Sequence, residues 1–304
     1  MGDKTGILWT DHTFNPWIGC TKVSPGCKNC YAARRDARHL HGPEDHWGLG
    51  APRKTMSVEY WEKPLRWAKA AEAEGRRHKV FAASMADIFD AEAPLIERRF
   101  FWKLIEATSG WLDWQLVTKR PERIPIVIEE DGLSPDFFLK YRCWLITSTE
   151  DQERADLRIP LILWIPAAIH GISAEPLLGP LDLNSALENE ISFVVDGYAG
   201  SPLASAHYEV KPPRLQWVIC GGESGPGARP MHPDWARGLR DQCQAAGVPF
   251  FFKQWGEYTP VGEVAGLREH FSFTDGTILC KVGKEVAGAS LDGIELMHFP
   301  EVQI

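Results

Sequence analysis

The sequence predicts an α/β fold built on a parallel sheet, and two patterns in its 304 residues lead to this prediction. Six short apolar runs recur along the chain. Each is apolar on both faces and is followed by polar residues, as buried parallel strands are. Helix-like segments separate the runs, and such alternation is typical of α/β proteins. The runs are residues 79–84, 114–118, 143–148, 170–174, 216–220 and 248–253.

Three segments between or before these runs are expected to form helices. Residues 59–74 are rich in Ala and Trp and are compatible with a helix. Residues 94–108 carry apolar side chains at roughly helical spacing. Residues 234–246 place apolar side chains on one face and end at Gly247, a typical helix stop.

Two stretches depart from the alternation. Residues 184–214 are polar and rich in Gly, Pro and Ser, which indicates an insertion or a long loop. Residues 256–304 lose helical periodicity and carry β-like pieces at 271–273 and 278–282. We therefore expect an α/β domain over 1–255, followed by a small β-rich C-terminal appendage. Six or more strands suit either an open doubly wound sheet or a full or partial (β/α) barrel.

The composition is that of an ordinary globular protein, with 44% apolar and 24% charged residues. The net charge of −8 argues against a general electrostatic nucleic-acid binder, although it leaves room for a local basic groove. No run of 18 apolar residues and no signal-peptide pattern is found, so we expect a cytoplasmic protein. In a reducing compartment, an odd number of cysteines, here seven, argues against a disulfide framework.

Three of the cysteines, Cys20, Cys27 and Cys30, are spaced C-x6-C-x2-C in a segment rich in Pro and Gly. A loop of this kind can turn its thiols toward one point, and soft thiolates suit iron–sulfur clusters or zinc. A structural zinc site needs four ligands, and His39 or His41 could supply the fourth. Three cysteines alone leave one iron of a 4Fe-4S cluster open. We favour the cluster, with a zinc loop or plain buried thiols as alternatives.

Polar side chains follow each predicted strand, and a Gly-rich segment, Gly-Gly-Glu-Ser-Gly-Pro-Gly at 221–227, follows one of them. Ligand sites of parallel α/β proteins lie at the carboxyl ends of the strands. Any one of these residues could equally be a structural charge, and 221–227 could be a tight connection, but their regularity favours a site. The candidate cofactor-binding residues are Ser84, Asp87, Thr118, Lys119, Ser148, Glu175, Gly221, Gly222, Glu223 and Ser224.

The segment 221–227 has neither the G-x-G-x-x-G nor the Walker pattern, which argues against a dinucleotide or P-loop site. Tryptophan is abundant, and basic residues lie near five tryptophans of the N-terminal part. Aromatic rings can stack on nucleobases, although they more often pack in cores. These residues are Trp9, Trp17, Trp47, Trp61, Trp67, Arg34, Arg35, Arg38, Arg53 and Lys54.

The strings Asn-Pro-Trp-Ile-Gly-Cys at 15–20 and Gly-Cys-Lys-Asn-Cys-Tyr-Ala at 26–32 resemble the cluster motif of radical S-adenosylmethionine (SAM) enzymes of the spore photoproduct lyase type. The first gap between cysteines has three residues in those enzymes and six here. The resemblance implies a full or partial (β/α) barrel whose cluster loop follows the first strand. It also implies that Cys20, Cys27 and Cys30 hold a 4Fe-4S cluster.

That cluster would reduce SAM bound to its open iron, giving methionine and a 5′-deoxyadenosyl radical that abstracts hydrogen from the substrate. An electron donor such as flavodoxin or ferredoxin is implied as a partner. The whole chain also resembles a phage and prophage family of three-cysteine proteins (DUF5131 type). This second resemblance rests on the cysteine loop and on residues 5–11, 116–121, 217–229, 250–256 and 283–293.

Together these features lead us to expect a radical SAM enzyme acting on a nucleobase or a nucleic-acid-linked substrate, in DNA repair or hypermodification. Tyr31, beside the cluster, and Cys143, at the start of a predicted strand, are candidate hydrogen donors. The alternative is a non-catalytic phage protein that binds nucleic acid or a partner and is stabilised by zinc or a cluster. A metal-free hydrolase or transferase is a third interpretation, and the missing G-x-S-x-G elbow disfavours a serine hydrolase.

Overall fold

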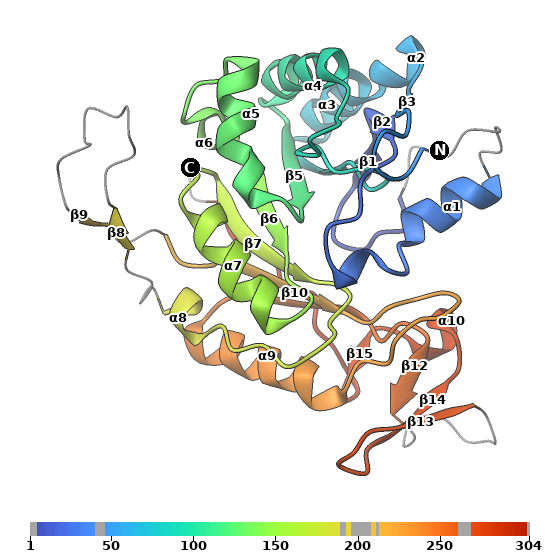
Figure 1. The fold of residues 1–304 in the computed structure, drawn as a ribbon. Coiled ribbons are helices and arrows are strands. Elements are labelled where there is room, and N and C mark those ends of the chain that lie inside the picture. The colour runs from blue at the N-terminus through green and yellow to red at the C-terminus, as the bar shows by residue number, and fades with distance from the viewer. Residues whose placement is uncertain are drawn as a thin grey trace.

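The computed structural model describes residues 5–39, 46–188, 193–195, 208–210, 213–260 and 269–302. Seven strands form one parallel sheet, which confirms the α/β prediction (Figure 1). All six predicted runs are strands of this sheet, and a seventh lies near the N-terminus. In spatial order the strands are β1 (His12–Phe14), β4 (His78–Ala82), β5 (Leu112–Thr118), β6 (Trp144–Ser148), β7 (Ile169–Ala174), β10 (Trp217–Gly221) and β11 (Phe250–Gln254).

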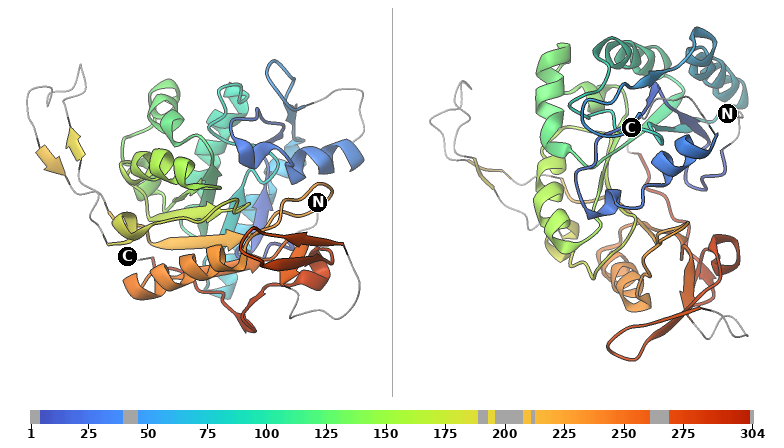
Figure 2. Two further views of the ribbon diagram at one scale, coloured as in Figure 1. Left: turned by 60° about the horizontal axis from the view of Figure 1, so that its bottom comes forward. Right: turned by 45° about the vertical axis from the view of Figure 1, so that its right-hand side comes forward.

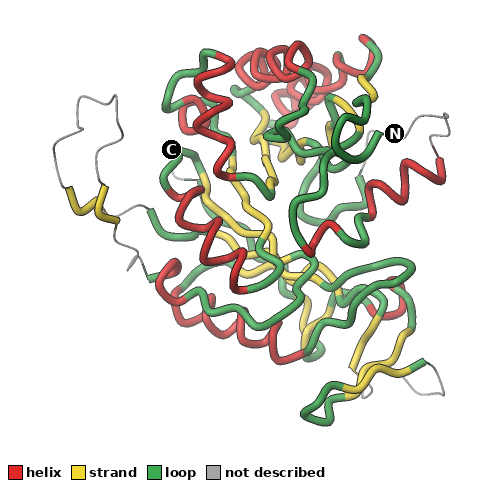
Figure 3. The backbone as a smooth tube through the Cα atoms, in the orientation of Figure 1, coloured by secondary structure: helices red, strands yellow, loops and turns green. Residues whose placement is uncertain are grey.

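The spatial order of these strands follows their order along the chain. A doubly wound sheet would reverse its order at a switch point, so that alternative is wrong. The sheet curls into a partial barrel, with its strands inside and its helices outside (Figures 2 and 3). The main covering helices are α3 (Lys63–Glu74), α4 (Leu95–Thr108), α5 (Ile124–Asp131), α7 (Gln152–Leu163) and α9 (Pro233–Ala246).

Two of the three expected helices are confirmed as α4 and α9, and α9 ends at Gly247, whose φ of 63° is left-handed. The segment 59–74 instead forms two helices, α2 (Val58–Trp61) and α3, divided at Glu62. Pro64 near the start of α3 explains the division, since proline has no N–H to donate to the preceding turn.

Side chains alternate between the two faces of the sheet and so divide the core in two. Those on the outer face pack beneath the helices. On the inner face, large apolar side chains near the amino ends of the strands, including Trp144, Trp217 and Phe251, form a second cluster. Polar side chains replace them near the carboxyl ends, as Ser148 in β6 and Lys253 in β11 show. The inside of the curled sheet is therefore filled at one end and lined with polar groups at the other.

The C-terminal segment is β-rich, as expected. Its described elements are β12 (Tyr258–Pro260), β13 (His270–Ser272), β14 (Ile278–Lys281), α10 (Lys284–Ala287), β15 (Ser290–Leu291) and β16 (Ile294–Glu295). The pieces predicted at 271–273 and 278–282 correspond to β13 and β14. The segment contains a three-stranded antiparallel sheet, in the order β12-β14-β13, and the hairpin β15-β16.

The end of this segment returns to the main sheet. Met297 forms an antiparallel bridge with Phe251, and the indole Nε1 of Trp217 donates to the carbonyl of His298 at 2.9 Å. Phe299 packs against the Trp217 ring, with centroids 5.6 Å apart. Met297 and Phe299 therefore pack against the inner face of the main sheet.

The predicted insertion at 184–214 is described only in part. It includes α8 (Asn184–Leu187) and the hairpin of β8 (Phe193–Val195) and β9 (Tyr208–Val210), which stands away from the main sheet (Figure 1). Positions 189–192, 196–207 and 211–212 lie outside the described residues. In the part of the chain that the structure describes, no helix has both the length and the apolar character needed to cross a membrane.

Trp217→Ala should lower the free energy of unfolding by about 3–5 kcal/mol, because it removes a large buried side chain from the inner cluster. Trp217 is fully buried, and its ring lies 5.5 Å from that of Trp144. Phe100→Ala is the control, since Phe100 is 58% exposed on α4, and it should change stability by less than about 0.5 kcal/mol. Urea unfolding followed by circular dichroism measures both, and equal losses would contradict the placement of Trp217.

Candidate functional site

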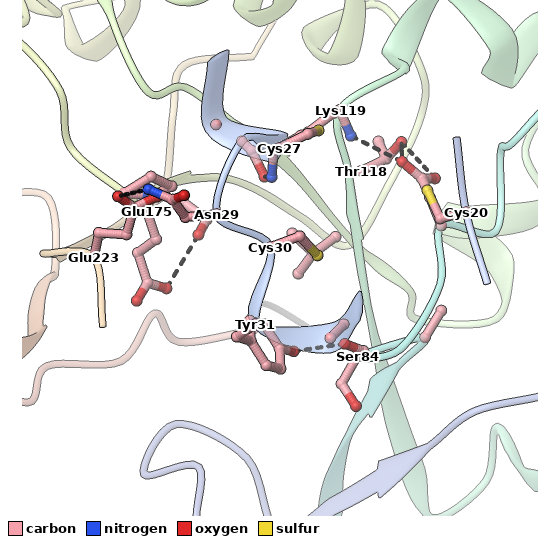
Figure 4. Close-up of a pocket in the computed structure, with 18 of the residues that line it drawn as sticks. Cys20, Cys27, Asn29, Cys30, Tyr31, Ser84, Thr118, Lys119, Glu175 and Glu223 are labelled. Carbon is pink, nitrogen blue, oxygen red and sulfur yellow. Dashed lines mark hydrogen bonds between the residues drawn. The ribbon is translucent and has the colours of Figure 1, made fainter. Parts of the chain in front are cut away.

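The three clustered cysteines line one cavity of about 210 Å³ at the carboxyl ends of the parallel strands (Figure 4). They follow β1 and the short strand β2 (Trp17–Ile18), which pairs with β3 (Lys54–Thr55). Cys27 ends a 3₁₀ turn, and Cys30 directly precedes α1 (Tyr31–His39). All three are partly exposed free thiols, whereas the other four cysteines are buried: Cys143, Cys220, Cys243 and Cys280.

A buried carboxylate, that of Glu150 two residues after β6, anchors the cysteine loop. Its Oε1 accepts the backbone N–H of Gly26 at 3.1 Å, and its Oε2 accepts from Nη1 of Arg158 at 2.8 Å. A Cβ on Gly26 would lie 3.0 Å from the carboxyl carbon, so glycine fits best there. Burial alone would raise the pKa of Glu150, but the hydrogen bond with Ser24 and the charge of Arg158 outweigh it and lower that pKa.

The cysteine loop and α1 are also bound to the Gly-rich segment that follows β10. Nδ2 of Asn29 donates to Oε2 of Glu223 at 2.9 Å and to the carbonyl of Gly227 at 2.7 Å. Nη1 of Arg34 donates to the carbonyl of Pro226 at 2.6 Å. Segments almost 200 residues apart in the sequence thus form adjacent walls of the cavity. Asn29 was not predicted as a site residue, and its place within the cysteine motif is its sequence signal; Arg34 was noted only as one of the basic residues near the N-terminal tryptophans.

Nine of the ten predicted cofactor-binding residues line this cavity. The tenth, Gly221, lies behind the wall, where a Cβ would come 2.8 Å from Oε1 of Glu175. Its role is therefore to leave room for Glu175. The nine lining residues are Ser84, Asp87, Thr118, Lys119, Ser148, Glu175, Gly222, Glu223 and Ser224.

Several of these residues already bond to one another. The Asp87 carboxylate accepts from Oγ1 of Thr118 at 2.9 Å and from Nη1 of Arg120 at 2.8 Å. Nζ of Lys119 donates to Oγ of Ser148 at 3.0 Å. Asp87 and Thr118 therefore join the ends of neighbouring strands, and Lys119 is held in a defined position on the wall.

Two further carboxylates lie on the wall beside the Gly-rich segment. Glu175 pairs with Nζ of Lys253 at 2.9 Å and accepts from Oγ of Ser173 at 3.1 Å. Glu223 pairs with Nη2 of Arg229 at 2.6 Å. Burial alone would raise the pKa of Glu223, but its hydrogen bonds with Arg229 and Asn29 lower it, so this carboxyl is ionised at neutral pH.

Cys20 has an electrostatic environment of its own. Burial and the nearby Asp87 raise the pKa of its thiol to about 12, while Arg120 opposes them. Nη1 of Arg120 lies 3.5 Å from the Cys20 sulfur. Without a metal, Cys20 is therefore a protonated thiol with a guanidinium beside it. A soft metal that binds it must displace the proton.

The structure separates the two candidate hydrogen donors. Tyr31 lines the cavity, and its hydroxyl donates to the carbonyl of Ser84 at 2.6 Å. Cys143 directly precedes β6, at the opposite end of that strand from the cavity. It is fully buried in the outer core, where desolvation raises its pKa. Of the two, only Tyr31 lies at the site.

The aromatic and basic residues of the N-terminal part have mixed roles. Trp17 and Trp67 are core residues, whereas Trp9 and Trp47 reach the cavity wall. Arg53 is buried in ion pairs with acidic side chains, one of which is Asp90 at 3.0 Å. Packing therefore explains much of a pattern that suggested contacts with nucleobases.

The cavity offers thiol and carboxylate donors, which are ligands of the kind that zinc and 4Fe-4S clusters use. No group of three or more His, Cys, Asp or Glu side chains among the described residues is arranged to hold a metal ion. His41 lies outside those residues, and so does the side chain of His39. A zinc ion needs its ligands at one point, whereas each cysteine of a 4Fe-4S cluster binds a different iron. The three thiols line one cavity but are not gathered around a single ion among the described residues.

A family model described as "protein of unknown function (DUF5131)" matches residues 4–300, and the chain belongs to that family. This match confirms the whole-chain resemblance seen in the sequence. Comparisons with curated proteins and with solved structures give no match.

Glu150→Gln should lower the free energy of unfolding by about 3–5 kcal/mol at neutral pH, because it leaves Arg158 buried without an opposite charge. The pKa of Glu150 is lowered in the folded state, so its carboxylate stabilises the fold above the unfolded-state value of about 4.3. That contribution is lost as the pH falls through the folded-state pKa. The difference between variant and wild type should therefore shrink in acid.

Urea unfolding at neutral pH and below about pH 4 measures this difference. Glu153→Gln is the matched control, because the Glu153 side chain is 78% exposed and should contribute little at either pH. A Glu150→Gln effect that is small, or that does not change with pH, would contradict the anchoring role of Glu150.

Proposed function

We propose that this protein is a radical SAM enzyme that holds a 4Fe-4S cluster on Cys20, Cys27 and Cys30. One observation carries the proposal: the three partly exposed cysteines line one cavity, while the other cysteines are buried. The cavity lies at the carboxyl ends of a singly wound parallel sheet, where barrel enzymes have their sites. A nucleobase, free or linked to nucleic acid, is the proposed substrate, because of the likeness to photoproduct lyases and the phage-type family.

A 4Fe-4S cluster held by Cys20, Cys27 and Cys30 would supply the electron for reductive cleavage of SAM to methionine and a 5′-deoxyadenosyl radical, which would abstract hydrogen from the substrate. The residues of the chain bind and orient the reactants. Lys119, held by Ser148, offers an ammonium group to a carboxylate. Glu175 and Glu223 offer carboxylate oxygens to ammonium or hydroxyl groups. Trp9 at the wall and the apolar cluster behind it exclude water from that side.

The contacts of the cysteine loop suit it to hold a cluster in a fixed orientation. Glu150 anchors Gly26, and Asn29 joins the loop to Glu223. Arg120, 3.5 Å from the Cys20 sulfur, can donate to the thiolate once the proton has left. Such a hydrogen bond stabilises the charged ligand and fixes its direction.

Anaerobic reconstitution with iron and sulfide tests the proposal. The wild type should bind iron and acid-labile sulfide in equal amounts, and its optical and EPR spectra should change when SAM is added. With dithionite it should then form 5′-deoxyadenosine. Cys20→Ala, Cys27→Ala and Cys30→Ala should each lose most of the bound iron and all SAM cleavage, because each removes one cluster ligand.

Cys243→Ala is the matched control, because Cys243 is a buried residue of α9 outside the cavity. It should keep both the cluster and SAM cleavage. One zinc per chain without iron would favour the non-catalytic alternative. The absence of both a spectral change with SAM and 5′-deoxyadenosine would overturn the radical SAM proposal.

A further inference from the structure

A second and larger cavity, of about 580 Å³, adjoins the cysteine cavity. The two cavities share six lining residues: Tyr31, Phe81, Ser84, Ser224, Lys253 and Gln254. The volume of this outer cavity is within the range of about 300–1,000 Å³ that is usual for small-molecule sites, whereas the cysteine cavity is smaller. A substrate next to a cluster and SAM would therefore have to extend into the outer cavity.

The charge of the outer cavity is opposite to that of the protein as a whole. Three cationic side chains line it, Arg35 from α1, Lys253 from β11 and Lys284 from α10, and none of its described lining residues is acidic. The chain as a whole has 41 acidic and 33 basic residues. A cavity that gathers only positive charge in an acidic protein indicates an anionic ligand.

Two of these three charges form no ion pair within the described part of the chain. Lys253 pairs with Glu175, which lines the cysteine cavity. Neither Arg35 nor Lys284 forms an ion pair with any residue that the structure describes, although both are exposed. Partial desolvation of the Lys284 ammonium group and the nearby charge of Lys253 lower the pKa of Lys284. The carboxylates of Glu175 and Glu285 raise this pKa, but by less.

The unpaired charge indicates which anion fits. A phosphate monoester carries a charge of about −1.5 to −2 near neutral pH, which matches the two unpartnered cations. A carboxylate or an internal phosphodiester carries a single negative charge. The same cavity also has an apolar wall that includes Ile7, Leu8, Phe81 and Met85. A cationic wall and an apolar wall in one cavity suit a ligand that has a phosphate at one end and a base at the other.

We propose that the outer cavity binds the phosphate monoester of a nucleotide, through Arg35, Lys253 and Lys284. This inference rests on the proposed function, because it names the substrate class of that enzyme. Such a monoester occurs in a free nucleotide and at the phosphorylated end of a nucleic-acid strand, but not within the strand. Tyr31, on the wall between the cavities, would then lie between the bound nucleotide and the cysteines.

Isothermal titration of the full-length protein with thymidine 5′-monophosphate tests the site, and binding itself needs neither SAM nor a reductant. The wild type should bind this nucleotide about tenfold or more tightly than thymidine, because only the nucleotide has the phosphate. Binding of phosphodiesters within a strand is tested with an oligothymidylate that lacks a terminal phosphate. This oligonucleotide should bind no better than thymidine. The same oligonucleotide with a 5′-phosphate tests whether the site accepts strand ends. An affinity equal to that of the mononucleotide would show that strand ends are accepted, and an affinity equal to that of the unphosphorylated oligonucleotide would show that only free nucleotides are accepted.

Arg35→Ala and Lys284→Ala should each weaken nucleotide binding about tenfold and leave thymidine binding unchanged. Lys284→Arg should restore most of the affinity. Lys281→Ala is the matched control, because this neighbouring lysine of β14 pairs with Glu269 and does not line the cavity. Equal affinities of the wild type for thymidine and its monophosphate would overturn the inference without relying on any variant.

The outcomes for this site and for the proposed function can be told apart. Nucleotide binding that depends on Arg35 and Lys284, in a protein that never cleaves SAM, would support the phosphate site and refute the radical SAM function. SAM cleavage without phosphate-dependent binding would refute the phosphate site alone.

Discussion

Parallel strands bring their carboxyl ends to one edge of a sheet, because each crossover returns the chain to the opposite edge before the next strand begins. In this protein six such crossovers join the seven strands in the order β1-β4-β5-β6-β7-β10-β11, and all of them advance in one direction. The loops after the strands therefore meet at one end of a curled sheet. This topology brings together the cysteine loop, the Gly-rich segment and the residues after β4, β5 and β6, and hydrogen bonds such as that between Asn29 and Glu223 fix their positions.

The inner face of a curled sheet must be filled or lined, and here both occur. Aromatic side chains fill the amino ends of the strands, and the end of the chain adds Phe299 to them. At the carboxyl ends the inward side chains are polar and leave a cavity. The side chains that point inward along each strand thus stabilise the sheet near its amino ends and line a cavity near its carboxyl ends.

Many polar groups of the site bond to one another, which limits what they can do for a ligand. Asp87, Thr118 and Arg120 form one such group, and Glu150 with Arg158 forms another. Buried networks of this kind hold the cavity walls in fixed positions. The groups that line the two cavities and can bond a ligand include the three thiols, Lys119, Glu175, Glu223 and the three cations of the outer cavity.

The sequence by itself determined the α/β class, the six strand positions, the helices α4 and α9, and the cysteine loop. These features follow from local periodicity, helix stops and residue spacing, which the chain displays directly. Only the tertiary structure decided between a doubly wound sheet and a partial barrel, since strand order is set by pairing between distant segments. It also decided that Cys143 lies in the core, that Gly221 makes room for Glu175, and that Arg35 and Lys284 meet at one cavity. Those outcomes depend on contacts between residues far apart in the chain, for which local sequence carries no signal.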